Sequence, residues 1–265
     1  MIFGAEMIYR ARGLRKIYKH GKNEVTAVDD VSLDIAAGER LGIVGESGSG
    51  KSTLIRMLAG LSKPTSGEIF LDDERITGKK ERELAPMRAR VQVVFQDPRS
   101  SLDPRMKIRK IVTEALRSPW VKGRLGITDD PDARCAQVLE QVELDPADAD
   151  KYPHEFSGGQ RQRIAIARAL ASHPDVLIAD EAVSALDVSV RAQVLNLLNR
   201  IADQENLTLL FVSHDLAVVR YLCDRVIVMR NGKIVESGDT SKVLYEPEAE
   251  YTKNLLSAIP RLRVD

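Results

Sequence analysis

The chain has 265 residues, and its 39 Lys and Arg residues balance 39 Asp and Glu residues, so its formal net charge is zero. This length suits one large domain with a sizeable core. The balanced charge and an aromatic content of only 5% argue against nucleic acid as the main ligand. No apolar run approaches the ~20 residues that a membrane-spanning helix needs, and the first ten residues lack the pattern of a secretion signal. If the protein serves a membrane process, we expect it to act from the cytoplasmic side through partners.

Hydrophobic patterning predicts alternating strands and helices in the first 95 residues. Val31, Leu33 and Ile35 alternate with polar residues, as in a half-buried strand. Apolar residues at helical spacing predict a helix directly after a glycine-rich loop. The predicted elements are strands at 31–35, 40–44, 68–71 and 91–95 and a helix at 51–61.

Residues 97–153 have a different character, because six prolines interrupt short helical patterns at 108–116 and 133–142. We therefore predict an inserted helical subdomain. Beyond residue 157 the α/β alternation resumes, and Asn231-Gly232 predicts a hairpin turn. The later predicted elements are helices at 160–171 and 188–204 and strands at 176–179, 207–212 and 226–229. This order predicts an α/β fold with a largely parallel core sheet and helices on both faces.

The two cysteines, Cys135 and Cys223, lie far apart, and neither belongs to a CxxC pair. Their spacing predicts no disulfide framework and no zinc or cluster site. We expect two reduced thiols.

A phosphate-binding loop is predicted between the strand at 40–44 and the helix at 51–61. Its sequence is Gly45-Glu46-Ser47-Gly48-Ser49-Gly50-Lys51-Ser52, with Thr53 next in the chain. Glycines let the backbone wrap around a phosphate with its N–H groups pointing inward, and the N-terminus of the helix adds its dipole. Lys51 is expected to reach the β- and γ-phosphates of ATP, and the Ser52 hydroxyl to bind Mg²⁺. The alternative is a glycine-rich structural turn.

Two carboxylates, Asp180 and Glu181, directly follow the predicted strand at 176–179. The carboxyl ends of strands are where open α/β sheets bind ligands. We expect Asp180 to hold Mg²⁺, directly or through water, and Glu181 to act as the general base that polarises the attacking water. A solvated strand end is the alternative.

A second anion-binding turn is predicted at Ser157-Gly158-Gly159-Gln160, which opens a basic helix. Ser157 is a good N-cap, and the amides of Gly158 and Gly159 are expected to be exposed at the helix start. Together with the phosphate loop, residues 176–181 and Ser213-His214-Asp215, this turn resembles the ABC ATPase family in every signature position and in the family's order. The resemblance covers about residues 5–260.

The resemblance implies an α/β fold: a P-loop NTPase core with a mainly parallel sheet, an N-terminal antiparallel β-subdomain and an inserted α-helical subdomain. We expect one ABC ATPase domain over 1–265. Its parts are the β-subdomain and P-loop part of the core at 1–95, the glutamine loop and helical subdomain at 96–157, the rest of the core at 158–238 and a C-terminal extension at 239–265.

The resemblance also assigns roles to three further residues. Gln96 is implied to contact Mg²⁺ and the attacking water, and His214 to touch the γ-phosphate. The alternatives are a solvated loop glutamine and a core histidine. Tyr18 matches the aromatic residue that stacks on adenine; a strand-packing tyrosine is the alternative, with Tyr9 as a weaker candidate for the stacking role.

Members of the family work as head-to-tail dimers, in which the SGGQ turn of one subunit closes over the γ-phosphate held by the P-loop of the other. The run Ser184-Ala185-Leu186-Asp187 matches the loop that crosses this interface, so Asp187 joins the candidate nucleotide-binding residues. Phe156 replaces the usual Leu before the turn, and Ala182-Val183 replaces the usual Pro-Thr after Glu181. Neither position touches phosphate in the family, so we expect both sites to remain competent.

Residues 95–105 are similar to the glutamine loop of peptide and nickel importer ATPases, and 250–260 are similar to their C-terminal extension. This likeness implies a cytoplasmic, peripheral subunit at the inner membrane that hydrolyses ATP to drive uptake of peptides or related solutes. It implies a second ATPase, two membrane-spanning permease subunits and, indirectly, an external solute-binding protein, with no nucleic acid. In such importers a short helix of each permease subunit docks near a glutamine loop, which places residues 97–109 at the docking site. Another solute, such as nickel chelates or opines, is an alternative to peptides. Alternatives to a transport ATPase are a soluble assembly ATPase without transport and a regulatory partner with little hydrolysis. For residues 97–109 the alternative to a docking segment is a plain linker.

Overall fold

The computed structural model describes residues 6–21, 23–125 and 130–257, and the chain forms two compact units. The first unit combines Met1–Thr77 with Leu210–Asp265, and the second consists of Gly78–Leu209. The four consecutive parts expected from the sequence divide the chain differently, and that division stays a prediction. Of the expected C-terminal extension, residues 258–265 lie outside the described residues.

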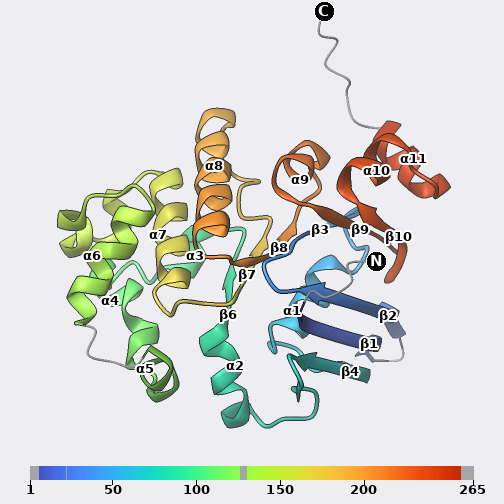
Figure 1. Cartoon of the computed structure of the whole chain (residues 1–265), viewed down its shortest axis with the longest axis horizontal. Helices are drawn as coiled ribbons and strands as arrows, with labels where there is room; N and C mark the ends of the chain where they lie inside the picture. Colours follow the sequence, from blue (N-terminus) through green and yellow to red (C-terminus); the bar gives the residue numbers. More distant parts are fainter. Residues whose placement is uncertain (1–5, 22, 126–129, 258–265) are drawn as a thin grey trace, which may run out of the picture. The chain divides into compact units, whose positions relative to one another are not determined.

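The first unit contains an antiparallel sheet with the strand order β2-β1-β4-β5 (Figure 1). These strands are β1 (Met7–His20), β2 (Asn23–Ala36), β4 (Ser66–Leu71) and β5 (Glu74–Arg75). The predicted alternation in β2 is confirmed, because Val31, Leu33 and Ile35 are buried and the residues between them are exposed. Simple alternation does not predict β1, because its pairing register with β2 shifts between Ala11 and Leu14 and breaks the two-residue period.

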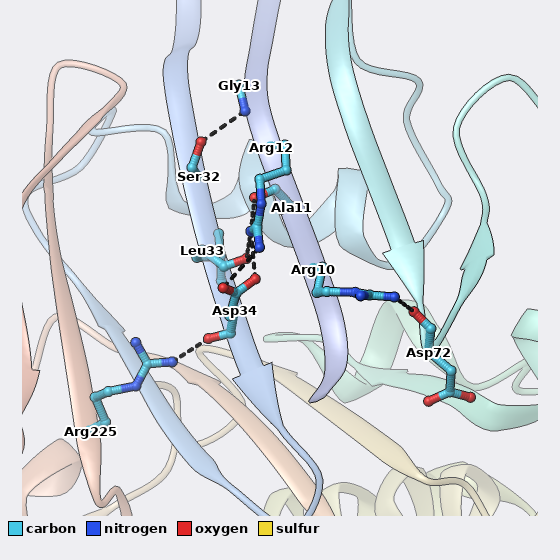
Figure 2. Close-up of polar contacts among 9 residues, drawn as sticks. All are labelled: Arg10, Ala11, Arg12, Gly13, Ser32, Leu33, Asp34, Asp72 and Arg225. Carbon is cyan, nitrogen blue, oxygen red and sulfur yellow. Dashed lines mark hydrogen bonds and ion pairs between the residues drawn. The ribbon is translucent and has the colours of Figure 1, made fainter. Parts of the chain in front are cut away.

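Arginines bind this sheet together and tie it to a neighbouring strand (Figure 2). Arg12 of β1 forms an ion pair with Asp34 of β2, and Arg10 donates to the Asp72 carbonyl oxygen at 2.9 Å. Arg225, at the start of β9 (Arg225–Arg230), donates to the Asp34 carbonyl oxygen at 2.6 Å. Hydrogen bonds from charged donors are stronger than neutral ones, so these contacts fix the sheet against β9.

The remaining strands of the first unit surround the predicted glycine loop. β3 (Arg40–Val44) pairs in parallel with β9, and β9 pairs antiparallel with β10 (Lys233–Asp239). Asn231 and Gly232 between β9 and β10 both have positive φ, at 49° and 78°, which confirms the predicted hairpin turn. The helices of this unit are α1 (Lys51–Leu58), α9 (Leu216–Leu222), α10 (Thr240–Tyr245) and α11 (Glu250–Ser257).

Helix α1 ends three residues earlier than predicted. Gly60 takes a left-handed conformation with φ 66°, which terminates a helix, and Leu61 beyond it is exposed. The prediction of a helix to residue 61 was wrong because an apolar residue at helical spacing does not continue a helix past such a glycine.

The second unit combines a parallel strand pair with the predicted helical insert. β6 (Val91–Val94) pairs in parallel with β7 (Val176–Asp180). β8 (Thr208–Val212) contains the boundary between the units and is fully buried. The helical elements of this unit are Glu81–Leu84, α2 (Ala85–Arg90), α3 (Pro98–Ser101), α4 (Ile108–Val112), Glu114–Arg117, α5 (Pro119–Leu125), α6 (Pro131–Gln141), Pro146–Asp150, Pro153–Glu155, α7 (Gly158–Leu170) and α8 (Val188–Gln204).

The prolines of the insert explain why its helices are short. Five of the six begin a helical element, where the missing N–H has no intrahelical partner to lose. The predicted helix at 108–116 is interrupted at Thr113, whose hydroxyl donates to the Arg109 carbonyl oxygen at 2.8 Å and whose ψ of 5° ends α4.

Helix α7 is the centre of the second unit, since it contacts α3, α4, α6, α8 and β6. Its C-terminus is capped by Arg134, which is 4% exposed and donates to the Leu170 and Ala171 carbonyl oxygens at 2.6 and 3.2 Å. No helix in the described ranges is both long enough and apolar enough to cross a membrane. Both cysteines are free and buried, and burial raises the pKa of the Cys135 thiol to about 11.

Candidate functional site

The glycine loop lies between β3 and α1, close to the backbone of two other strands. Gly45 has φ 147°, and a Cβ there would lie 2.2 Å from the Met229 carbonyl oxygen of β9. Gly50 has φ 106°, and a Cβ there would lie 2.3 Å from the Ala27 carbonyl oxygen of β2. Both positions therefore exclude a side chain on two grounds, the backbone conformation and the lack of space.

The loop is also fixed by hydrogen bonds to the hairpin and to the C-terminal helix. The Gly232 N–H donates to the Ser49 carbonyl oxygen at 2.9 Å, and the Glu46 N–H donates to Tyr251 Oη at 3.2 Å. Within the loop, the Ser49 N–H donates to the Glu46 carbonyl oxygen at 3.2 Å. The first turn of α1 follows at once, with Ser52 exposed and Thr53 half-buried.

Lys51 folds back into this loop. It is only 6% exposed, and its Nζ donates to the carbonyl oxygens of Gly45 and Glu46, both at 2.8 Å. An ammonium group held by neutral carbonyls, next to the N-terminus of a helix, is attractive to an anion, because a charge-assisted bond to phosphate is stronger than a bond to a neutral acceptor. The geometry therefore suits phosphate binding.

Ser213-His214-Asp215 lies in the same unit and has a clear local structure. The Ser213 N–H donates to the Ile43 carbonyl oxygen at 3.3 Å, and Asp215 caps α9 by accepting from the Ala217 N–H at 3.0 Å. His214 between them is exposed, so it is not the core histidine of the alternative interpretation.

The two candidate tyrosines differ in exposure. Tyr18 is 44% exposed on β1, with Lys16 Nζ 5.1 Å from its ring centroid, so it does not pack in the core. Tyr9 is fully buried and donates to the Leu58 carbonyl oxygen at 2.9 Å. The weaker candidate, Tyr9, was wrong for a stacking role, because a buried ring cannot receive a base.

In the second unit, Gln96 and Glu181 are joined through Ser184. Ser184 Oγ donates to the Glu181 carbonyl oxygen at 3.0 Å and accepts from Gln96 Nε2 at 3.2 Å. Glu181 directly follows Asp180 at the end of β7 and has a positive φ of 48°. A non-glycine residue in this conformation is strained and is held by its surroundings, as is common at functional sites. Sequence reasoning did not identify Ser184 as the link.

The turn at 157–160 is a complete capping box at the start of α7. Ser157 Oγ accepts from the Gln160 N–H at 3.3 Å, and Gln160 Oε1 accepts from the Ser157 N–H at 3.0 Å. Gly158 is exposed, as expected, but Gly159 is buried. A Cβ at Gly159 would lie 2.2 Å from Val190 Cγ1 of α8.

The start of α8 joins this turn to the loop at 184–187. Asp187 caps α8 by accepting from the Val190 N–H at 3.0 Å, and the Val190 side chain covers Gly159. Two predicted site elements therefore meet at one residue, Val190, that the sequence patterns did not reveal. The only sequence signal for Val190 was its position three residues after Asp187, where an N-cap side chain accepts a backbone hydrogen bond.

Comparison with known proteins identifies the class. The family model described as ABC transporter matches residues 28–184. The chain is 49% identical over 249 residues to a putative peptide import ATP-binding protein of Brucella ovis, covering 94% of this chain and 77% of that protein. It is 45% identical over 260 residues to the oligopeptide transport ATP-binding protein OppF of Bacillus subtilis, covering 96% and 83%.

Solved structures give the same result. A dimeric post-hydrolysis ATP-binding cassette bound to ADP and phosphate matches with a TM-score of 0.77 and 30% identity, over 88% of this chain and 98% of that one. The structure of cbiO1 from Clostridium perfringens, part of an ABC transporter complex, matches with a TM-score of 0.77 and 28% identity over 92% of both chains.

The chain therefore belongs to the ABC transporter family. It is an ATPase with the ATP-binding cassette fold, and the predicted fold class, an antiparallel sheet with a mainly parallel sheet and helices in a P-loop NTPase fold, is confirmed.

The contact between Gly159 and Val190 gives a matched test of the turn. Gly159→Ala is expected to destabilise the protein by about 1–3 kcal/mol, because the added methyl overpacks a filled space. Gly158→Ala adds a methyl where nothing lies within 4 Å, so its unfolding midpoint is expected to match the wild type more closely. Adding Val190→Ala to Gly159→Ala should restore part of the lost stability. Equal denaturant midpoints for the two single variants would contradict this packing.

Proposed function

We propose that this ATPase energises the uptake of peptides through a membrane importer. The observation that carries the proposal is the likeness to relatives named as peptide import and oligopeptide transport proteins, which are 45–49% identical over most of the chain. The similarity of residues 95–105 to the glutamine loop of peptide importers supports the same conclusion.

The glycine loop binds the phosphates of ATP in this proposal. Gly45 to Thr53 surround the phosphates with backbone N–H groups, and Lys51 moves its ammonium from the loop carbonyls to the β- and γ-phosphates. Two observations support this role. The Lys51 ammonium is buried in the loop, and the backbone at Gly45 and Gly50 passes too close to neighbouring strands to carry a side chain. Tyr18, exposed on β1, stacks on the adenine ring.

Mg²⁺ is the implied metal ion, and the candidate ligands fit it. Mg²⁺ prefers oxygen ligands and is usually held by one or two protein groups together with substrate phosphates. Ser52 offers an exposed hydroxyl, Asp180 a carboxylate at a strand end, and Gln96 an amide oxygen, since its Nε2 is the atom that donates to Ser184. When bound, the ion would neutralise charge on the phosphates.

Glu181 is the proposed general base. Its carboxylate accepts a proton from water as the water oxygen bonds to the γ-phosphorus and the bond from that phosphorus to the β–γ bridging oxygen breaks. Gln96 orients the water, and the exposed His214 contacts the γ-phosphate. The strained backbone of Glu181 and its link through Ser184 to Gln96 support a shared task.

A second ATPase completes the proposed site. The capped turn at 157–160 presents an N-terminal helix end of its own, and Asp187 lies at the neighbouring start of α8. In this proposal they close over the ATP of the partner ATPase, and the partner's turn closes over the ATP of this chain. The binding of ATP then holds the pair together, and hydrolysis releases it.

The proposed docking site for a permease subunit, at residues 97–109, is fixed to α7. Arg168 Nη1 donates to the Ser101 carbonyl oxygen at 2.5 Å, and Leu102 is buried. This anchoring favours a docking segment over a plain linker. A displacement of the segment by a docked permease would be transmitted to α7, the helix that begins at the SGGQ turn. We place the protein at the cytoplasmic face of the inner membrane, with an external solute-binding protein acting through the permeases.

Replacing the proposed base tests the chemistry. Glu181→Gln is expected to bind ATP as the wild type does and to lose turnover by about 10²–10⁴-fold, the usual contribution of a general base. Glu205→Gln, an exposed glutamate of the same unit, is the matched control and should hydrolyse ATP normally. Hydrolysis by Glu181→Gln at the control's rate would contradict the assignment.

A pull-down tests the proposed transport function. The tagged Glu181→Gln chain, with Mg-ATP, should recover two integral membrane proteins and a second ATPase from gently solubilised host membranes, identified by mass spectrometry. Recovery of soluble proteins alone would leave the ATPase chemistry in place and contradict the importer.

A further inference from the structure

A tyrosine of the C-terminal helix reaches the phosphate loop. Tyr251 lies in α11, is only 7% exposed, and its Oη accepts a hydrogen bond from the Glu46 N–H at 3.2 Å. The two residues are 205 positions apart in the sequence. The contact therefore joins the last described helix of the chain to the loop that is proposed to hold the nucleotide.

This hydrogen bond holds one end of a peptide group whose other end is held by Lys51. The Gly45 carbonyl oxygen accepts from Lys51 Nζ at 2.8 Å, and the Glu46 N–H belongs to the same planar peptide. A peptide that follows a glycine rotates at low cost, because glycine tolerates a wide range of backbone angles. Lys51 and Tyr251 together fix the orientation of this peptide.

Tyr251 is itself held by the hairpin of β9 and β10. The Arg230 guanidinium lies 4.7 Å from the centroid of its ring. The Glu236 carboxylate of β10 accepts from the N–H groups of Glu248 and Ala249 at 2.8 and 3.1 Å, directly before α11. Figure 1 shows α11 beside this hairpin, whose Gly232 N–H also donates to the Ser49 carbonyl oxygen at 2.9 Å. The hairpin therefore supports the loop twice, directly and through Tyr251.

We propose that Tyr251 is a positioning residue for ATP binding, which keeps the Gly45–Glu46 peptide in place when Lys51 leaves the Gly45 carbonyl for the phosphates. The inference rests on the proposed phosphate-binding role of the loop. Without Tyr251 Oη, the departure of Lys51 leaves this peptide unrestrained at both ends. A rotated peptide changes the direction of a loop carbonyl, and a carbonyl oxygen turned toward a phosphate repels it.

The test replaces the hydroxyl and keeps the ring. Tyr251→Phe is expected to raise both the Kd for Mg-ATP and the KM for ATP about three- to tenfold, the effect of one hydrogen bond, with kcat nearly unchanged. Tyr245→Phe is the matched control: Tyr245 lies in α10, is 68% exposed, and accepts from Arg220 Nη1 at 3.0 Å. It should bind ATP as the wild type does.

Four outcomes would count against the proposal. A merely structural contact would lower thermal stability and kcat at an unchanged KM, so that pattern would overturn the proposal, as would equal Kd values for the two variants. Hydrogen exchange of the Glu46 amide gives a second measurement and should be faster in Tyr251→Phe than in Tyr245→Phe; equal exchange would also overturn it. If the wild-type chain itself binds no ATP, the proposed function fails, and this inference fails with it.

Discussion

The close approach of the phosphate loop to its neighbouring backbone is the constraint on which the rest of the site depends. At Gly45 and Gly50 a carbonyl oxygen of another strand occupies the space where a side chain would begin. The path of the loop at these two glycines is therefore closely confined. That fixed path also places Lys51 in a shell of carbonyl oxygens, where its charge is kept near the N-terminus of α1. A buried ammonium beside a helix start is suited to phosphate, because it can exchange neutral carbonyl oxygens for charged phosphate oxygens when the anion arrives.

The second unit also contains a turn that requires a glycine because there is no room for a side chain. In this turn, at 157–160, the obstacle is the Val190 side chain of α8 and not a backbone oxygen. Asp187 fixes Val190 from the other side by capping α8. The SGGQ turn and the loop after Glu181 are therefore one packed structure. Phe156, directly before the turn, and Ala182 and Val183, directly after Glu181, are buried apolar residues.

Much of the fold and the local chemistry could be predicted from the sequence, because both rest on short-range patterns. The bounds of α8 at 188–204 and the hairpin at Asn231-Gly232 follow from periodicity and turn chemistry alone. The β1 strand could not be predicted in this way, because shifts in its register remove the alternation that reveals a strand. Contacts between distant residues were equally hidden: nothing in the spacing of Tyr251 and Glu46 indicates their hydrogen bond. The sequence motifs identified the candidate site residues, whereas the contacts that hold those residues in place became visible only in the folded structure.

The most direct test of this account is the affinity of the full chain for Mg-ATP, measured by isothermal titration, with Lys51→Ala compared with Lys63→Ala. Lys63 is an exposed lysine shortly after α1, so its removal changes the net charge equally without touching the loop. We expect Lys63→Ala to bind like the wild type and Lys51→Ala to bind at least about tenfold more weakly, because a charge-assisted bond is lost. Equal affinities for the two variants would contradict the central role of the Lys51 ammonium.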